Sequence, residues 1–285
     1  MTAKTLLAAV AAMALLGCTG PTRETTSPVL DPVEQLQQLL PADALFLGEQ
    51  HDAPDHQRIE RVVVEQLARQ QTLAALVLEM ASQGQSTLAL RPQASEEQVR
   101  TALQWDNAGW PWAAYGPAVM AAVRAGVPVL GASLPKARLA QAMKDDELDA
   151  RLSAAALLTQ QERVRAGHCH LLPESQIAPM TRIQIGRDVA MAQTVAQAMR
   201  PGKTVLLLAG AGHVARDLGV PLHLPRDLSL RTVLLQAGAS DQDAEPENRF
   251  DQTWPTQTAP AKDYCADLRL QRSAAAAAAQ SKKAP

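Results

Sequence analysis

The chain has 285 residues, of which 47% are hydrophobic and 20% are charged, proportions typical of a folded globular protein and not of a disordered or fibrous one. Aromatic residues make up only 3%, so the core must be built mainly from aliphatic side chains and methionine. The formal net charge of −2 argues against a nucleic-acid-binding protein, because such proteins usually carry a basic face.

The first 17 residues have the features of a bacterial signal peptide. Lys4 precedes an apolar run over residues 6–16, which is shorter than the roughly 20 residues that span a bilayer but suits a signal. The run ends in Leu-Leu-Gly-Cys, which resembles a lipobox; the alternative is an ordinary secretory signal with an incidental cysteine. We therefore expect cleavage before Cys18, acylation of Cys18 with fatty acids such as palmitate, and stable membrane anchoring. By resemblance to Gram-negative lipoproteins, Thr19 favours the outer membrane.

Composition divides the remainder into three parts. Residues 18–34 are rich in Thr, Ser and Pro and are expected to form a tether. Residues 35–240 alternate apolar runs with amphipathic segments and are expected to form the folded domain, with a helical insertion at about 135–180. Residues 241–285 are polar and then alanine-rich, which predicts a largely disordered tail.

Apolar runs of strand length recur through the domain. The expected strands are residues 44–47, 73–78, 127–130, 204–208 and 230–235. Helical spacing of apolar residues after the first strand predicts a helix there, with Asp55 as its candidate N-cap, and further helices are expected at 116–125 and about 180–199. Strands that read as continuous apolar runs and alternate with helices indicate an α/β fold, in which helices flank both faces of a mostly parallel sheet.

Polar side chains follow three of these strands. Glu49 and His51 follow the first, Glu79 ends the second, and His213 follows the fourth after the sequence Gly-Ala-Gly. In parallel sheets, ligands bind beyond the carboxyl ends of the strands, so we expect these side chains to share one pocket. Glu49 and His51 would lie about 6–7 Å apart on one face if the strand continued. Any one of them alone could be an ordinary polar turn residue; their joint placement favours a site.

Other motifs are weak or missing. The Gly-Ala-Gly sequence at 210–212 mimics a dinucleotide fingerprint, but Gln236 stands where the acidic partner is expected. The chain contains no His-Glu-x-x-His, Gly-x-Ser-x-Gly or Gly-x-x-x-x-Gly-Lys motif, and no Cys-x-x-Cys-His for covalent haem attachment. The sequence leaves open whether Cys169 and Cys265 form a disulfide.

With these residues in view, the chain resembles the ChaN-type haem-binding lipoproteins, which belong with the Tiki, TraB and erythromycin-esterase-like proteins. The resemblance covers about residues 40–236 and rests on LFLGEQH, VLEM, WPWAAYGPAV, HCHLLPESQIAPMTRIQIGRDVAMA and LLLAGAGHV. The Gly-Glu-x-His and Gly-x-Gly-His elements are shared across the superfamily, whereas the string that begins at His168 is more particular to the ChaN branch. His170 departs from the family, which often has a small residue there.

The resemblance implies a parallel sheet with a small helical subdomain, a role in haem or iron uptake at the cell envelope, and haem held between the two subunits of a homodimer. Haem iron accepts axial His, Cys, Met or Tyr ligands, so Tyr115 and His168 are the candidate ligands. Tyr115 could equally pack beside Trp110 and Trp112. The tryptophan-rich segment 105–115 favours a flat apolar ligand, which makes Trp110 a candidate pocket residue.

The rival interpretation is a metal-dependent hydrolase, as in the related proteases and esterases. Glu49, His51, Glu79 and His213 would then act as acid and base, and a divalent metal ion would be bound by Glu49, His51 and His213. Enzymatic activity is the less favoured alternative, and a scaffold with neither activity is weaker still.

Overall fold

The computed structural model describes residues 31–238, 248–270 and 273. The expected signal peptide, Cys18, most of the tether and the end of the expected tail lie outside these residues. Within them, no helix is both long and apolar enough to cross a membrane.

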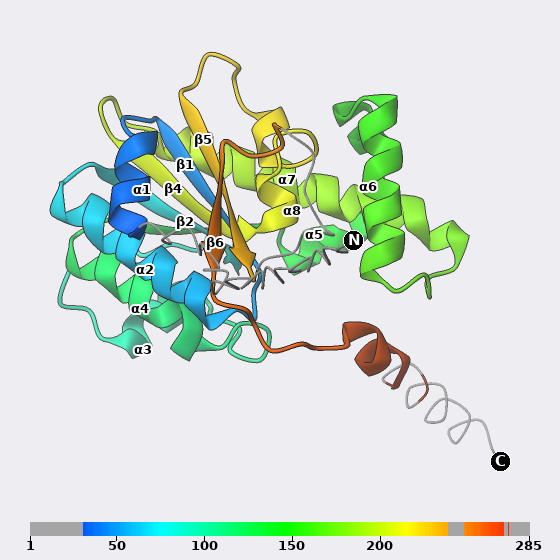
Figure 1. Cartoon of the computed structure of the whole chain (residues 1–285), viewed down its shortest axis with the longest axis horizontal. Helices are drawn as coiled ribbons and strands as arrows, with labels where there is room; N and C mark the ends of the chain where they lie inside the picture. Colours follow the sequence, from blue (N-terminus) through cyan, green and yellow to red (C-terminus); the bar gives the residue numbers. More distant parts are fainter. Residues whose placement is uncertain (1–30, 239–247, 271–272, 274–285) are drawn as a thin grey trace, which may run out of the picture.

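The framework is a six-stranded sheet with the strand order β3-β2-β4-β1-β5-β6 (Figure 1). All five neighbouring pairs run parallel, so the carboxyl ends of the strands meet at one edge. The strands are β1 (Ala44–Glu49), β2 (Leu73–Ser82), β3 (Val129–Ser133), β4 (Thr204–Gly210), β5 (Leu230–Ala237) and β6 (Gln252–Thr256). This confirms the expected α/β class.

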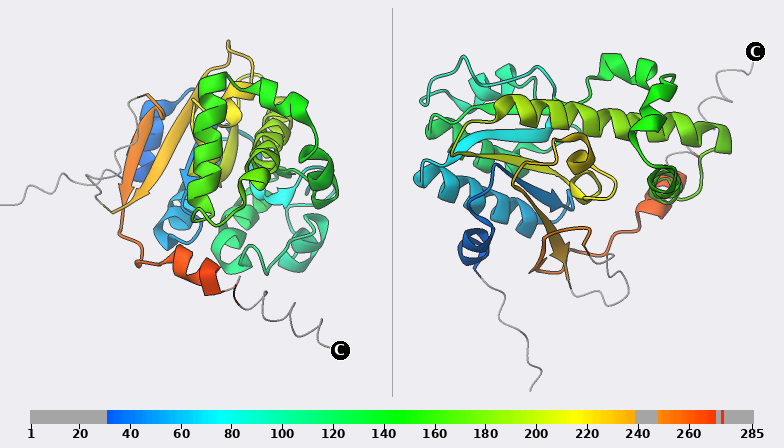
Figure 2. Two further views of the ribbon diagram at one scale, coloured as in Figure 1. Left: turned by 90° about the vertical axis from the view of Figure 1, so that its right-hand side faces the viewer. Right: turned by 90° about the horizontal axis from the view of Figure 1, so that it is seen from above.

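Helices cover both faces of the sheet (Figure 2). The α-helices are α1 (Pro32–Leu39), α2 (Pro54–Arg69), α3 (Glu96–Ala102), α4 (Trp112–Arg124), α5 (Lys136–Ala142), α6 (Ala154–Gly167), α7 (Ile177–Ala198) and α8 (Ala211–Val214). The 3-10 turns are η1 (Asp146–Arg151), η2 (Glu174–Gln176) and η3 (Val220–His223), and residues 264–270 form a further short helix. Helix α7 lies along one face, while α1, α2 and α4 lie on the other.

Alternation along β1 shows how the two layers form. Leu45 and Leu47 belong to the apolar cluster that contains α2 and α4, whereas Phe46 belongs to the cluster that contains α7. Every residue of β1 is buried. A strand covered on both faces has no solvent side, which is why the sequence shows an unbroken apolar run.

Three local expectations were wrong. Helix α1 begins at Pro32, inside the expected tether, because the side chain of Asp31 accepts a hydrogen bond from the Val33 amide and caps it. Helix α2 begins at Pro54, which proline favours at a first helical position, so Asp55 lies in the first turn and not at the N-cap. Strand β2 continues to Ser82, so Glu79 lies within it instead of ending it.

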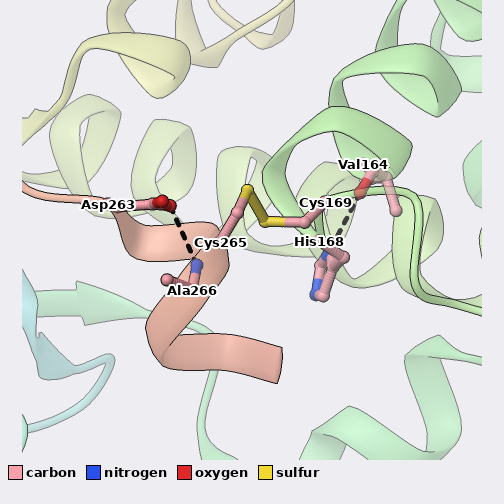
Figure 3. The surroundings of a disulfide bond; sticks show 6 residues. All are labelled: Val164, His168, Cys169, Asp263, Cys265 and Ala266. Atoms are coloured by element: carbon pink, nitrogen blue, oxygen red, sulfur yellow. Dashed lines mark hydrogen bonds between the residues drawn. A yellow bond between two sulfur atoms is a disulfide. The ribbon is translucent and has the colours of Figure 1, made fainter. Parts of the chain in front are cut away.

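The expected disordered tail was also wrong over its described part. Residues 252–256 form β6, which pairs with β5 at the sheet edge, and Trp254 is only 2% exposed. Further along, Cys265 forms a disulfide with Cys169, which follows α6 (Figure 3). The polar composition of this segment concealed one buried tryptophan and one covalent link, and each offsets part of the entropy of ordering the chain.

Candidate functional site

The four polar residues expected to share a pocket do meet at the carboxyl ends of β1, β2 and β4. Strand β1 ends at Glu49, which lies beside Gly210 of β4. Pairing between β2 and β4 ends at Leu78, and the next side chain, Glu79, accepts a hydrogen bond of 2.8 Å from the Gly210 amide. The end of the β-ladder therefore frees Glu79 to face the neighbouring strands.

Acidic and imidazole groups alternate across this edge. Nδ1 of His51 donates to Oε1 of Glu49 at 2.8 Å, because the chain turns after Glu49 and brings the ring back onto the carboxylate. Oε2 of Glu79 lies 3.8 Å from Nε2 of His51, and Oε1 of Glu79 lies 3.4 Å from Nε2 of His213. Nδ1 of His213 donates to Oδ1 of Asp188 at 2.6 Å. The order is therefore Glu49, His51, Glu79, His213, Asp188.

The charge state of this row follows from burial and neighbouring charges. Burial opposes the charged form of His213, but the carboxylates of Glu79 and Asp188 outweigh it and raise the pKa of His213 to about 10. Burial would raise the pKa of Glu79, but the charge of His213 holds it well below the usual range. Burial raises the pKa of Asp188 to about 6. At neutral pH, His213 is a buried cation between two carboxylates.

His51 forms the boundary between this row and the solvent-facing pocket. Its side chain is 38% exposed, and its ring makes an edge-to-face contact with Trp110, at 4.7 Å between centroids. Burial lowers the pKa of His51, but the hydrogen bond to Glu49 and the charge of Glu79 together raise it. A Cβ on Gly210 would lie 2.9 Å from Nε2 of His51, so the missing side chain at Gly210 makes room for the imidazole.

A second cluster surrounds Glu49. The hydroxyl of Tyr115 donates to Oε1 of Glu49 at 2.8 Å, and the side-chain amide of Gln57 donates to Oε2. Glu60 is 1% exposed, and among the described residues its carboxylate oxygens have no hydrogen-bond partner. Burial and the negative charge of Glu49 raise the pKa of Glu60 well above its usual value, which favours the neutral form of this carboxyl group. Burial and the same charge raise the pKa of Tyr115.

A cavity of about 1080 Å³ opens over the row. Its apolar wall includes Trp110 and the first turns of α4, and its polar part includes the ends of β1 and β4. Three cationic residues also line it, namely Arg58, Arg61 and Lys262. The arrangement suits a flat apolar ligand that carries negative charge, since aromatic and apolar side chains would cover its faces while cations meet its acidic groups.

The candidate residues divide according to this cavity. Those that line it are Glu49, His51, Trp110, Tyr115 and His213. Glu79 lies behind them, bonded to Gly210 and facing both histidines. His168 is not among the lining residues; it follows α6, and its Nδ1 contacts the backbone oxygen of Val164 at 2.8 Å (Figure 3).

The metal-dependent hydrolase is not favoured by this geometry. Within residues 31–238 and 248–270, no group of three or more His, Cys, Asp or Glu side chains is arranged to hold a metal ion. The hydrolase interpretation assigns His51 and His213 to the metal ion. The ring nitrogens of these two histidines instead face the carboxylates of Glu49, Glu79 and Asp188.

Sequence reasoning missed several residues of the site. Asp188 was visible only as part of the ChaN-like string, and its role depends on α7 crossing behind β4. Gln57 and Glu60 occupy one face of α2, where helical spacing predicts only apolar packing. Tyr264 and Lys262 lie in the segment expected to be disordered, so no sequence pattern indicated that they line the cavity.

Comparisons with known proteins identify a family and a shared fold. Residues 35–224, more than half of the chain, match the family described as "Haem-binding uptake, Tiki superfamily, ChaN". Among solved structures, ChaN of Campylobacter jejuni, described with cofacial haem binding, is 22% identical with a TM-score of 0.61, over 73% of this chain and 87% of that one. This likeness shows a shared fold.

Two other structures are more distant. The type III effector HopBA1 is 14% identical with a TM-score of 0.44, over 81% of this chain and 99% of that one. A Bacillus cereus protein is 13% identical with a TM-score of 0.39, over 75% and 71% of the two chains. No curated protein matches the chain. The match over residues 35–224 establishes that the chain belongs to the ChaN family of haem-binding uptake proteins in the Tiki superfamily, whose cofactor is haem.

Proposed function

We propose that this protein binds haem non-covalently in the cavity at the carboxyl ends of β1, β2 and β4, and that it serves haem or iron uptake. The observation that carries the proposal is the pairing of an apolar wall containing Trp110 with cations at Arg58 and Arg61, in a member of a haem-binding family. Haem is flat and apolar with two carboxylates on one edge, which matches that pairing. The volume, about 1080 Å³, lies slightly above the roughly 300–1,000 Å³ typical of ligand sites.

Non-covalent binding is supported by the cysteines. Cys169 and Cys265 are joined to each other, so neither is free to form a thioether with a haem vinyl group. The third cysteine, Cys18, lies outside the described residues and is the expected lipidation site.

Haemin titration tests the proposal directly. The protein should develop a saturable Soret band with defined stoichiometry, and Trp110→Ala should weaken binding because it removes the aromatic side chain beside His51. Leu88→Ala is the matched control, since Leu88 is a 70% exposed apolar residue that does not line the cavity. Failure of the unaltered protein to take up haemin at micromolar concentration would refute the proposal.

The axial ligand is tested by two substitutions. Tyr115→Phe should shift the visible spectrum if a phenolate ligates the iron, although the hydroxyl would first have to leave Glu49. His168→Ala should shift it if an imidazole does; because His168 does not line the cavity, it would ligate iron only in a haem placed against α6, as a second subunit could provide. A spectrum unchanged in both variants would exclude both candidates.

We propose further that the protein is a homodimer that closes over haem. Two subunits exclude water from a porphyrin better than one open surface, and a ligand bound across an interface stabilises only the associated form. Sedimentation should therefore show a higher dimer fraction for the haem-loaded protein than for the apoprotein. An identical distribution would contradict the dimer proposal while leaving haem binding itself intact.

The envelope location rests on the signal-like N-terminus. Lipidated Cys18 would anchor the domain in the outer membrane, and more than one acyl chain is needed for stable anchoring. Cys18→Ser should abolish incorporation of labelled lipid and leave a precursor that is unprocessed or mislocalised. Labelling that persists in this variant would rule out lipidation at Cys18.

A further inference from the structure

The segment from residue 257 to 265, which we call the C-terminal strap, runs from β6 past the carboxyl ends of the strands to the α6 end of the molecule (Figures 1 and 2). It lies beyond residue 224, where the match to the family ends. Two of its side chains, Lys262 and Tyr264, nevertheless line the cavity. The cavity is therefore completed by residues that the family match does not include.

The strap is attached at its two ends. At the start, β6 is held where Nε2 of His56 contacts Oγ1 of Thr256 at 2.9 Å, and the Gln257 amide donates to Asp55 at 3.2 Å. At the far end, the hydroxyl of Tyr264 donates to Asp52, and Cys265 is bonded to Cys169. The described residues between the two ends pair with no strand, so Lys262 and Tyr264 are held over the cavity mainly by the attachments at the far end.

The disulfide is the decisive attachment of the two. Tyr264 is 50% exposed, so its hydrogen bond to Asp52 competes with water and contributes little by itself. Ordering the residues of the strap costs conformational entropy that one exposed hydrogen bond does not offset. Figure 3 shows Cys265 at the start of the short helix 264–270, whose first turn is capped by Asp263 through the Ala266 amide at 2.8 Å. The disulfide therefore places both Tyr264 and Lys262.

Lys262 differs from the other two cations of the cavity. Arg58 and Arg61 are paired with Asp55 and Glu65 on their own helix. The ammonium of Lys262 instead lies 5.0 Å from the ring centre of Tyr264. Its charge helps to lower the pKa of Asp52, but among the described residues it makes no direct ion pair with a carboxylate. A cation of this kind, beside an exposed aromatic ring, is available to a ligand that has both a carboxylate and a flat apolar surface.

We propose that the C-terminal strap is a disulfide-positioned wall of the haem cavity, in which Lys262 binds a propionate carboxylate and Tyr264 packs its ring against the porphyrin. The inference rests on the proposed haem binding. Cys169 and Cys265 act as positioning residues. Reduction by a dithiol, which becomes a disulfide as the two cysteines each gain an electron and a proton, would release the strap and weaken haem binding.

Spectral titration separates these roles. Lys262→Gln should weaken haemin binding about tenfold, the effect of losing one favourable charged contact. With haemin dimethyl ester, which has no carboxylates, the same substitution should have no effect. Tyr264→Ala should weaken binding of both ligands. Lys203→Gln is the matched control, because Lys203 is exposed just before the amino end of β4, at the opposite edge of the sheet.

The positioning role is tested with the double variant Cys169→Ser/Cys265→Ser. It should weaken haemin binding, and adding Lys262→Gln should then cause little further loss, because a released strap no longer holds the lysine in place. If the double variant folds poorly, dithiol treatment of the unaltered protein gives the same comparison.

Equal affinity of Lys262→Gln and the unaltered protein for haemin would overturn the inference, as would equal losses for haemin and its ester. Full additivity of the lysine and cysteine substitutions would overturn the positioning role. In each of these cases haem binding by the unaltered protein stands. Absence of binding by the unaltered protein would overturn the proposed function and this inference together.

Discussion

The buried cation at His213 makes a quantitative prediction about stability and pH. Its imidazolium is surrounded by Glu79 and Asp188, and its pKa rises from 6.5 to about 10. At 1.36 kcal/mol for each pKa unit, this difference corresponds to at most about 5 kcal/mol of stabilisation of the folded, protonated state. The attraction between His213 and Glu79 affects the pKa of both residues and is counted once.

The sign follows from proton binding. Because the folded state holds the proton of His213 more tightly than the unfolded chain, the contribution is complete below about pH 6.5. It is lost as the pH rises towards about 10. Glu79 has a depressed pKa, so its contribution is present above its usual pKa of 4.5 and is lost as the pH falls. Taken together, the contributions of His213 and Glu79 are largest between about pH 4.5 and pH 6.5.

His213→Gln should be destabilised by about 3–5 kcal/mol at pH 7, since it leaves two buried acidic groups without their cation. The difference in the free energy of unfolding between the variant and the unaltered protein should decrease as the pH approaches about 10, because the unaltered protein then loses the charge of His213. Urea unfolding across this pH range measures both free energies. His170→Asn, at an exposed position with a φ of 53° that asparagine tolerates, is the control. A gap of the same size at pH 7 and pH 10 would refute the assignment of charge to His213.

Further predictions concern the surroundings of the row. Glu60→Leu should raise the free energy of unfolding at neutral pH by about 1–3 kcal/mol, because it removes a buried carboxyl group without hydrogen-bond partners; a lower urea midpoint would contradict this. Gly210→Ala should cost about 1–3 kcal/mol and displace His51, seen as a changed imidazole NMR signal, since the new Cβ would lie 2.9 Å from Nε2. Its control, Gly167→Ala, meets no atom within 4 Å and should be neutral or slightly stabilising; equal losses in both variants would show that packing at His51 is not the cause.

Local patterns determined the class of fold and the place of the site. Five of the six strands were visible as apolar runs because the central part of a strand that is covered on both faces, such as residues 44–47 of β1, is apolar. Parallel strands bring their carboxyl ends to one edge, so the positions of Glu49, Glu79 and His213 after or near strand ends were sufficient to predict that they meet.

Tertiary structure decided what surrounds these groups. Asp188 reaches His213 only because α7 crosses the sheet, and Glu60 is buried behind Glu49 only because α2 packs against β1. Strand β6 and the C-terminal strap were hidden by their polar composition. Strand β6 is held by its pairing with β5 and by one buried tryptophan, and the strap is held by the disulfide between Cys265 and Cys169. None of these contacts has a local sequence signature. The periodicity of apolar residues in the sequence indicates whether a residue faces the core. Contacts between distant segments depend instead on how the layers pack against each other. That packing decides the charge state of the row from Glu49 to Asp188 and the composition of the cavity wall.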